Sequence, residues 1–283
     1  PLLRVLLTAM RPSQRLARSI DDVDVGYFGP DSVAWRLHAD PTMLAGGMRA
    51  LLVQALEPRA MAGVEQHSRY RTDPWGRLQR TTEFVFLTTY GDRATAETAC
   101  EKVRKVHERI RGVDPATGRA YSASDPDLLL WIHAVEVHSF VAAYRAYAGR
   151  LDDEDADRYV AEMVRVAEMV ELPAGMAPCT MGELREYLRA VDTLQITPAA
   201  REGMRTIFFP PMPLALRPLW AIPSTATLAI LPRVARRLYG LPWPAPVTLP
   251  VRANVFALSR VMNAVLPASP IIQRARARVA AAA

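Results

Sequence analysis

Residues 95–111 read TAETACEKVRKVHERIR, the stretch with the clearest secondary-structure pattern in the chain. Apolar side chains recur at positions 99, 103, 106 and 110, which is the three- and four-residue spacing of an amphipathic helix. Thr95 is a typical N-cap, an acid follows in the first turn, and Gly112 is a typical stop. The pattern therefore predicts a helix over 95–111.

His107 lies within this predicted helix, four residues after Val103 and three before Ile110. It therefore shares the apolar stripe and not the charged face of the helix. A histidine in such a position is either a satisfied core residue or a ligand that faces an internal site. Periodicity alone leaves both interpretations open.

Two neighbouring segments extend the helical pattern. Residues 41–56, PTMLAGGMRALLVQAL, are apolar enough to form a buried helix, and the adjacent Gly46 and Gly47 indicate either close helix packing or a flat, bulky group against them. Residues 82–92 have the composition of a strand or of a buried helix that ends at Gly91. The flanking helical patterns favour the helix.

The rest of the chain also predicts helices. They cover residues 126–149, the acid-led stretch 151–172 and residues 181–192, whose start has a capping box formed by Thr180 and Glu183. Shorter helices punctuated by proline follow. The longest uncharged run has 15 residues and contains three prolines, so no transmembrane helix is expected. The fold class is all-α.

Length and composition suggest one structural domain. The chain has 283 residues, of which 50% are hydrophobic and 23% charged, a globular composition. We expect a helical core over residues 1–205 and an Arg/Pro-rich helical extension over 206–283. The two cysteines show no metal-clip or disulfide spacing, so a reducing, cytoplasmic location is expected. Because the sequence begins at Pro1, it leaves open whether a leader has been cleaved.

Charge is distributed unevenly along the chain. The last 81 residues contain ten arginines and no acidic residue, whereas the preceding part has 25 basic and 29 acidic residues. Arginine alternates with apolar and aromatic groups in this segment, as in RRLYGLPWPAPVTLP, which favours contact with an anionic membrane surface. Alternatively, the segment wraps the body and pairs with its acids. No nucleic-acid motif accompanies it.

Other polar residues are candidates for a site. His133, Glu136 and His138 suggest a metal site, but side chains five residues apart on a helix point about 140° apart, which argues against convergence of the two imidazoles on one metal. Arg77 and Thr81 share a helical face. They can line a cleft together, although arginines on helices are usually solvated.

An ordered set of motifs resembles a known family. The motifs are FGPDSVAWRLHADPTMLAGGMRALLVQAL, RLQRTTEFVF, VRKVHERIRG and YSASDPDLLLWIHA, and the similarity covers roughly residues 25–245. Together they resemble the bacterial group related to latex-clearing rubber oxygenases and to the fungal oxygenase of mycophenolic acid biosynthesis, mpaB. The resemblance implies a globin-like or latex-clearing-protein-like helical bundle that encloses a heme b.

The resemblance also implies roles for individual residues. VRKVHERIR places the proximal iron ligand at His107, with Arg104 as a supporting residue. RLQRT places the distal pair at Arg77 and Thr81, which can hold heme propionates or polarise bound oxygen. Some rubber oxygenases have a distal lysine ligand where this chain has Arg80, and a guanidinium does not readily coordinate a metal.

Two further residues complete the expected pocket. Glu65 is the nearest upstream candidate for the family's distal carboxylate, and His133 is a second histidine that borders the heme. The implied activity is a heme-dependent oxygenase that uses dioxygen on an apolar, isoprenoid- or lipid-like substrate. The alternatives are a heme-binding sensor or carrier without oxygenase activity, and a peripheral membrane or interaction protein that has lost the cofactor.

Overall fold

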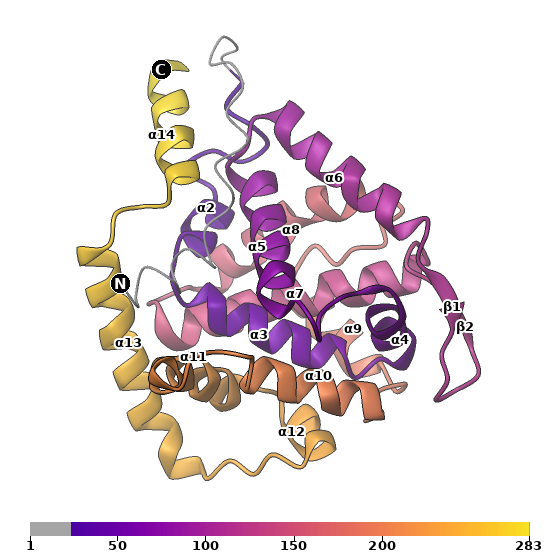
Figure 1. Cartoon of the computed structure of the whole chain (residues 1–283). Helices are drawn as coiled ribbons and strands as arrows, with labels where there is room; N and C mark the ends of the chain where they lie inside the picture. The colour runs from indigo at the N-terminus through magenta and orange to yellow at the C-terminus, as the bar shows by residue number, and fades with distance from the viewer. Residues whose placement is uncertain (1–23, 283) are drawn as a thin grey trace.

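A computed structural model describes residues 24–282, and the apolar N-terminal run and any leader lie outside this range. The described residues form helices joined by turns, with one short hairpin (Figure 1), which confirms the all-α class. The first elements are α2 (Val33–His38), α3 (Met43–Gln54), α4 (Pro58–His67), α5 (Pro74–Tyr90), α6 (Arg93–His107), β1 (Arg111–Val113), β2 (Ala120–Ser122) and α7 (Pro126–Tyr147). They are followed by α8 (Asp153–Met169), α9 (Met181–Ala190), α10 (Pro198–Phe208), η1 (Leu214–Leu216), α11 (Arg217–Ile230), α12 (Arg233–Tyr239), η2 (Ala245–Val247), α13 (Thr248–Val265) and α14 (Pro270–Ala282).

Helices α3 and α7 pack against each other at the centre of the fold. A β-carbon on Gly46 would lie 2.9 Å from Phe140 Cδ1 and 3.2 Å from the Ala143 β-carbon, so only glycine allows this approach. A β-carbon on Gly47 would meet nothing within 4 Å. The reason for glycine at position 46 is therefore close helix packing, not a bulky group.

A buried arginine joins this pair to a third helix. The Arg49 guanidinium donates to Ser139 Oγ at 2.5 Å on α7 and to the Ile230 carbonyl at 2.9 Å at the end of α11. It also lies 3.1 Å from His138 Nδ1. Burial lowers the pKa of Arg49 to about 10, and hydrogen bonds satisfy its donors instead of a carboxylate.

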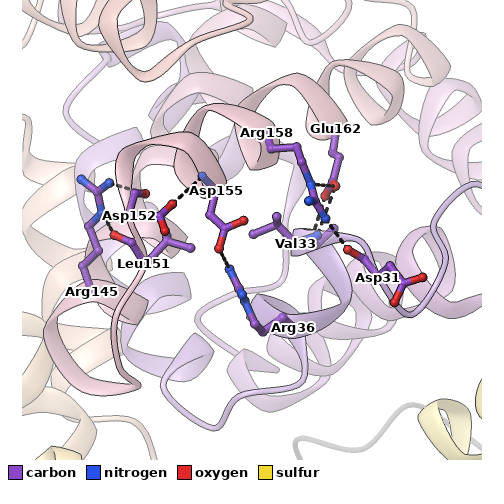
Figure 2. A network of polar contacts seen from close by, with 10 residues as sticks. Asp31, Val33, Arg36, Arg145, Leu151, Asp152, Asp155, Arg158 and Glu162 are labelled. Carbon is purple, nitrogen blue, oxygen red and sulfur yellow. Dashed lines mark hydrogen bonds and ion pairs between the residues drawn. The ribbon is translucent and has the colours of Figure 1, made fainter.

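Polar contacts fasten α2 to α8 (Figure 2). The Glu162 carboxylate accepts from the backbone N–H groups of Val33 at 3.1 Å and Ala34 at 2.8 Å. These N–H groups belong to the first turn of α2, where a helix has unpaired donors and favours negative charge. Arg36 forms an ion pair with Asp155 on the same face of α8.

The predicted helix over 95–111 is displaced toward the N-terminus. The N-cap is Asp92, whose carboxylate accepts from the Thr95 N–H at 2.7 Å, so Thr95 is inside the helix and is not its cap. The helix ends at His107, and Gly112 belongs to the hairpin, which the turn-rich sequence did not predict. Val106 is 55% exposed, so the apolar stripe is not covered along its whole length.

Two other expectations are confirmed, the end of α5 and the start of α9. Residues 82–90 continue α5, and Gly91 is its C-cap. Thr180 caps α9 by accepting from the Glu183 N–H at 3.2 Å. Helix α10 runs across the expected boundary at residue 205, and α11, α13 and α14 pack on α3, α7 and α5.

Within residues 24–282, no single helix has the length and apolar character needed to cross a membrane. Two bent pairs, α11 with α12 and α13 with α14, meet that criterion when each pair is taken together.

Replacing Gly46 and Gly47 separately by valine tests the central packing. Gly46→Val is expected to lower the free energy of unfolding by about 1–3 kcal/mol, because the added methyl groups overpack the contact with Phe140. Gly47→Val is the matched control and should change it by less than about 0.5 kcal/mol, since that side chain points into open space. Urea unfolding measures both, and equal losses would contradict the assignment.

Candidate functional site

A cavity of about 780 Å³ lies among α4, α5, α6, α7, α8 and α10. This volume is within the range of about 300–1,000 Å³ that is usual for small-molecule and cofactor pockets. Most of the lining is apolar, and its large side chains include Phe84, Leu129, Ile132, Met163 and Trp220. Polar side chains also reach the lining, and those that could act on a bound molecule come from α5, α6, α7 and α8.

His107, the last residue of α6, lines the cavity. Its Nδ1 is buried and has no hydrogen-bond partner among the described residues. Burial also lowers the pKa of His107, which keeps the imidazole neutral at neutral pH. The imidazole is therefore a polar group of the wall with a buried nitrogen that no described residue satisfies. The ring is in the state required of a metal ligand.

Helix α5 brings two arginines and a threonine to the same cavity. Arg77 donates to Ser68 Oγ at 2.8 Å, and burial lowers the pKa of its guanidinium. The Thr81 hydroxyl donates to the Arg77 carbonyl at 3.0 Å within the helix. Arg80 has a side chain 59% exposed and lies 3.3 Å from Asp73. The Arg77 guanidinium is therefore inside the cavity wall, and the Arg80 guanidinium is at the rim of the cavity.

Helix α7 contributes His133 and Glu136, one turn apart on its cavity face. Burial lowers the pKa of His133 to about 4 and raises that of Glu136 to about 7. No hydrogen bond to either side chain is present within residues 24–282. From the sequence, Glu136 was considered only as part of a metal site. Its position as an acid on the apolar face of a helix could also have indicated a buried carboxyl group.

The inner wall of the cavity includes Tyr159 of α8, held by a buried histidine. The Thr89 hydroxyl donates to the Val85 carbonyl at 2.7 Å, so it accepts from His38 Nδ1 at 2.7 Å. His38 Nε2 then accepts from the Tyr159 hydroxyl at 2.8 Å. The Tyr159 proton is thereby committed to His38, which fixes the position of this side chain in the cavity wall.

Two predicted site residues do not line the cavity. Glu65 accepts from the Tyr70 hydroxyl at 2.6 Å and pairs with Arg71 at 2.6 Å, so its carboxylate is already occupied. Arg104 donates to the Met169 carbonyl at 2.7 Å and lies 3.4 Å from Glu171, which ties α6 to the end of α8.

The remaining predicted residues are brought together. His107, Arg77, Arg80, Thr81 and His133 all border one cavity, although they come from three helices. His138 instead faces Arg49, as the 140° separation from His133 requires. In the described part of the chain, no group of three or more His, Cys, Asp or Glu side chains is arranged to hold a metal ion.

Residues 35–262 match the family described as ER-bound oxygenase mpaB/B'/Rubber oxygenase, catalytic domain. The chain belongs to this family. The match confirms the resemblance inferred from the sequence motifs, runs from α2 to α13, and includes every helix that lines the cavity. No curated protein and no solved structure matches the chain significantly.

Glu136→Gln is expected to stabilise the protein at pH 8 by about 1–3 kcal/mol and to have little effect at pH 4.5. The raised pKa means that between pH 4.5 and about pH 7 the folded protein holds a proton that the unfolded chain has released. The contribution of Glu136 to stability therefore falls as the pH rises through this range.

Urea unfolding of wild type and variant at both pH values measures this effect. The free energy of unfolding of the variant is compared with that of wild type at each pH. This subtraction removes the contribution of His133, whose lowered pKa makes the stability of both proteins rise with pH in nearly the same range. A difference that is the same at both pH values would show that the Glu136 carboxyl is not held in a desolvated site.

Proposed function

We propose that this chain is a heme b-dependent oxygenase that uses dioxygen on an apolar, isoprenoid- or lipid-like substrate. The observation that carries the proposal is the neutral His107 imidazole, with its unpaired Nδ1, in the wall of a largely apolar cavity. Membership of an oxygenase family supports the reaction class.

The residues around the cavity fit a heme. His107 would hold the heme iron, and Arg77 and Arg80 offer the charged donors that carboxylates such as heme propionates bind. Bound heme would supply the redox chemistry with dioxygen, while the protein sets the surroundings. Arg104, through its contacts with the end of α8, would act as a positioning residue for His107 by holding the last turns of α6 in place.

Two polar groups can act on the reacting atoms. The Arg77 guanidinium, with only one of its donors used by Ser68, would stabilise negative charge that develops in the cavity. Glu136 has a pKa of about 7, so near neutral pH its carboxyl can either accept or donate a proton. We propose Glu136 as the carboxylate of the site, in the role that sequence reasoning gave to Glu65.

The lining argues for the substrate class. Most of the wall surface is aliphatic or aromatic, and such surface binds apolar molecules and excludes water. Thr81 contributes a hydroxyl oxygen that can still accept a hydrogen bond while its proton is donated to the helix.

Titration of the purified protein with hemin tests the cofactor. Wild type is expected to develop a Soret band, and His107→Ala should abolish it or weaken hemin affinity by about 100-fold, as expected for loss of a ligand-shell residue. His133→Ala is the matched control and should leave the band largely intact, because His133 lines the same cavity but is not assigned as a ligand. A wild type without a Soret band would refute the heme assignment.

Dioxygen uptake tests the oxygenase assignment separately. With the isoprenoid hydrocarbon squalene as probe, Arg77→Gln is expected to lower the rate of uptake by about 100-fold, the effect of removing one preorganised donor. Arg201→Gln removes an equal charge from the exposed surface of α10 and should leave the rate unchanged. A Soret band without substrate-dependent uptake across a panel of isoprenoids and lipids would instead identify a heme sensor or carrier.

A further inference from the structure

Exposed apolar side chains gather in one segment of this protein. Among the large hydrophobic side chains exposed in the described residues, only Val106, Val113 and Met176 lie outside residues 209–265. The segment includes Phe209 at 80% exposure, Leu214 at 72%, Leu249 at 74%, Phe256 at 44%, Val261 at 57% and Val265 at 72%. Such clustering differs from the scattered exposed apolar residues of an ordinary surface.

Helix α13 shows this most clearly. It is apolar around most of its circumference, yet only a narrow strip contacts the protein, where Val255 packs near Tyr147 and Ser259 is 3% exposed. Leu249 and Phe256 share an uncovered flank, and Val261 lies on the outer side as well. Exposed apolar side chains concentrated on one helix in this way mark a surface that another partner covers.

A basic hollow adjoins this helix. Arg233, Arg236 and Arg237 of α12 line it together with Trp243, and its volume is about 640 Å³. The Trp243 indole N–H donates at 2.8 Å to the hydroxyl of Thr248, the first residue of α13, which holds the two features side by side. Figure 1 shows α11, α12 and α13 together along one edge of the molecule.

The arginines of this edge lack acidic partners within the described residues. Of the ten arginines after Glu202, Arg205 is the only one that forms an ion pair with an acid of residues 24–282, and its partner is Glu202 at 3.4 Å. Within the described residues the segment therefore packs on the body, as one of the two expectations had it, but apart from Arg205 its arginines do not pair with acids. The positive charge is available for an external anion.

We propose that the face formed by α12, η2 and α13, the docking face, binds the surface of an anionic lipid bilayer. The arginines of α12 receive lipid phosphate or carboxylate groups, and Leu249, Phe256 and Val261 enter the interface. Phe209 directly precedes Pro210, a residue of the cavity wall, so the exposed segment also borders the cavity.

Charge complementarity selects this partner over two others. A second copy of the chain would bring two arginine-rich faces together without acids between them. Residues 1–23 are also basic, with four arginines against two aspartates, so they complement the face poorly. An anionic bilayer alone offers both negative charge and an apolar interior.

Vesicle flotation with the full chain tests the proposal. At low salt we expect the protein to bind vesicles that contain phosphatidylcholine and phosphatidylserine. Binding should be lost at high salt, and vesicles of phosphatidylcholine alone should not bind the protein. R233Q/R236Q/R237Q should weaken it by about 100-fold. R109Q/R111Q/R119Q is the matched control: it removes three exposed arginines near the hairpin and should leave binding unchanged.

A second pair of variants tests the apolar contribution. F256S/V261S should weaken vesicle binding by about tenfold or more. V113S/M176S removes two apolar side chains of comparable exposure elsewhere, 55% and 40%, and should have no effect. Arg236 also donates to the Leu228 carbonyl at 3.3 Å, so the triple variant loses a contact within the fold. If circular dichroism shows that the triple variant is not folded, the double variant R233Q/R237Q, which keeps this contact, takes its place.

Three results would overturn the proposal. The first is a wild type that does not float with the phosphatidylserine vesicles. The second is an equal loss of vesicle binding in R109Q/R111Q/R119Q. A loss of binding that occurs only in R4Q/R11Q/R15Q/R18Q would likewise overturn it, because binding would then belong to residues 1–23. The third is a dimer that F256S/V261S converts to a monomer without vesicle binding, which would make the face a self-association surface. None of these results depends on heme or oxygenase activity.

Discussion

Helices α3 and α7 approach so closely that Gly46 has no room for a β-carbon beside Phe140. At this distance the rotation of α7 about its own axis is set, because each residue turns the helix by about 100°. Ser139 and Phe140 face α3, and His133 and Glu136 are consequently directed into the cavity. The positions of the ionisable groups at the site thus depend on a packing contact that contains none of them.

The ionisable side chains His107, His133 and Glu136 in the cavity wall are strongly desolvated. Burial lowers the pKa of His107 and His133, which keeps both imidazoles neutral, and raises the pKa of Glu136 toward neutrality, while Arg77 is a buried positive charge in the wall. In such surroundings each remaining polar group has a large effect on a bound molecule. This is the physical basis for assigning separate roles to a neutral ligand, a cationic donor and a carboxyl that can exchange a proton.

The two halves of the charge distribution behave differently in the fold. Acids of the body take part in caps and ion pairs, such as Glu162 at the start of α2 and Asp155 with Arg36. The C-terminal helices pack on α3, α5 and α7, and among the described residues most of their arginines have no acidic partner. The same segment therefore closes the fold on one side and presents a basic, apolar surface on the other.

The sequence by itself determined most helices, the end of α5 at Gly91 and the inward side of α6 that carries His107, because caps and hydrophobic spacing are local properties. It also indicated Arg77 and Thr81 through their four-residue spacing. The tertiary structure alone decided that Glu136 and not Glu65 borders the cavity, and that Gly46 serves helix packing. Those outcomes depend on which faces of distant segments meet, and no local pattern encodes that choice.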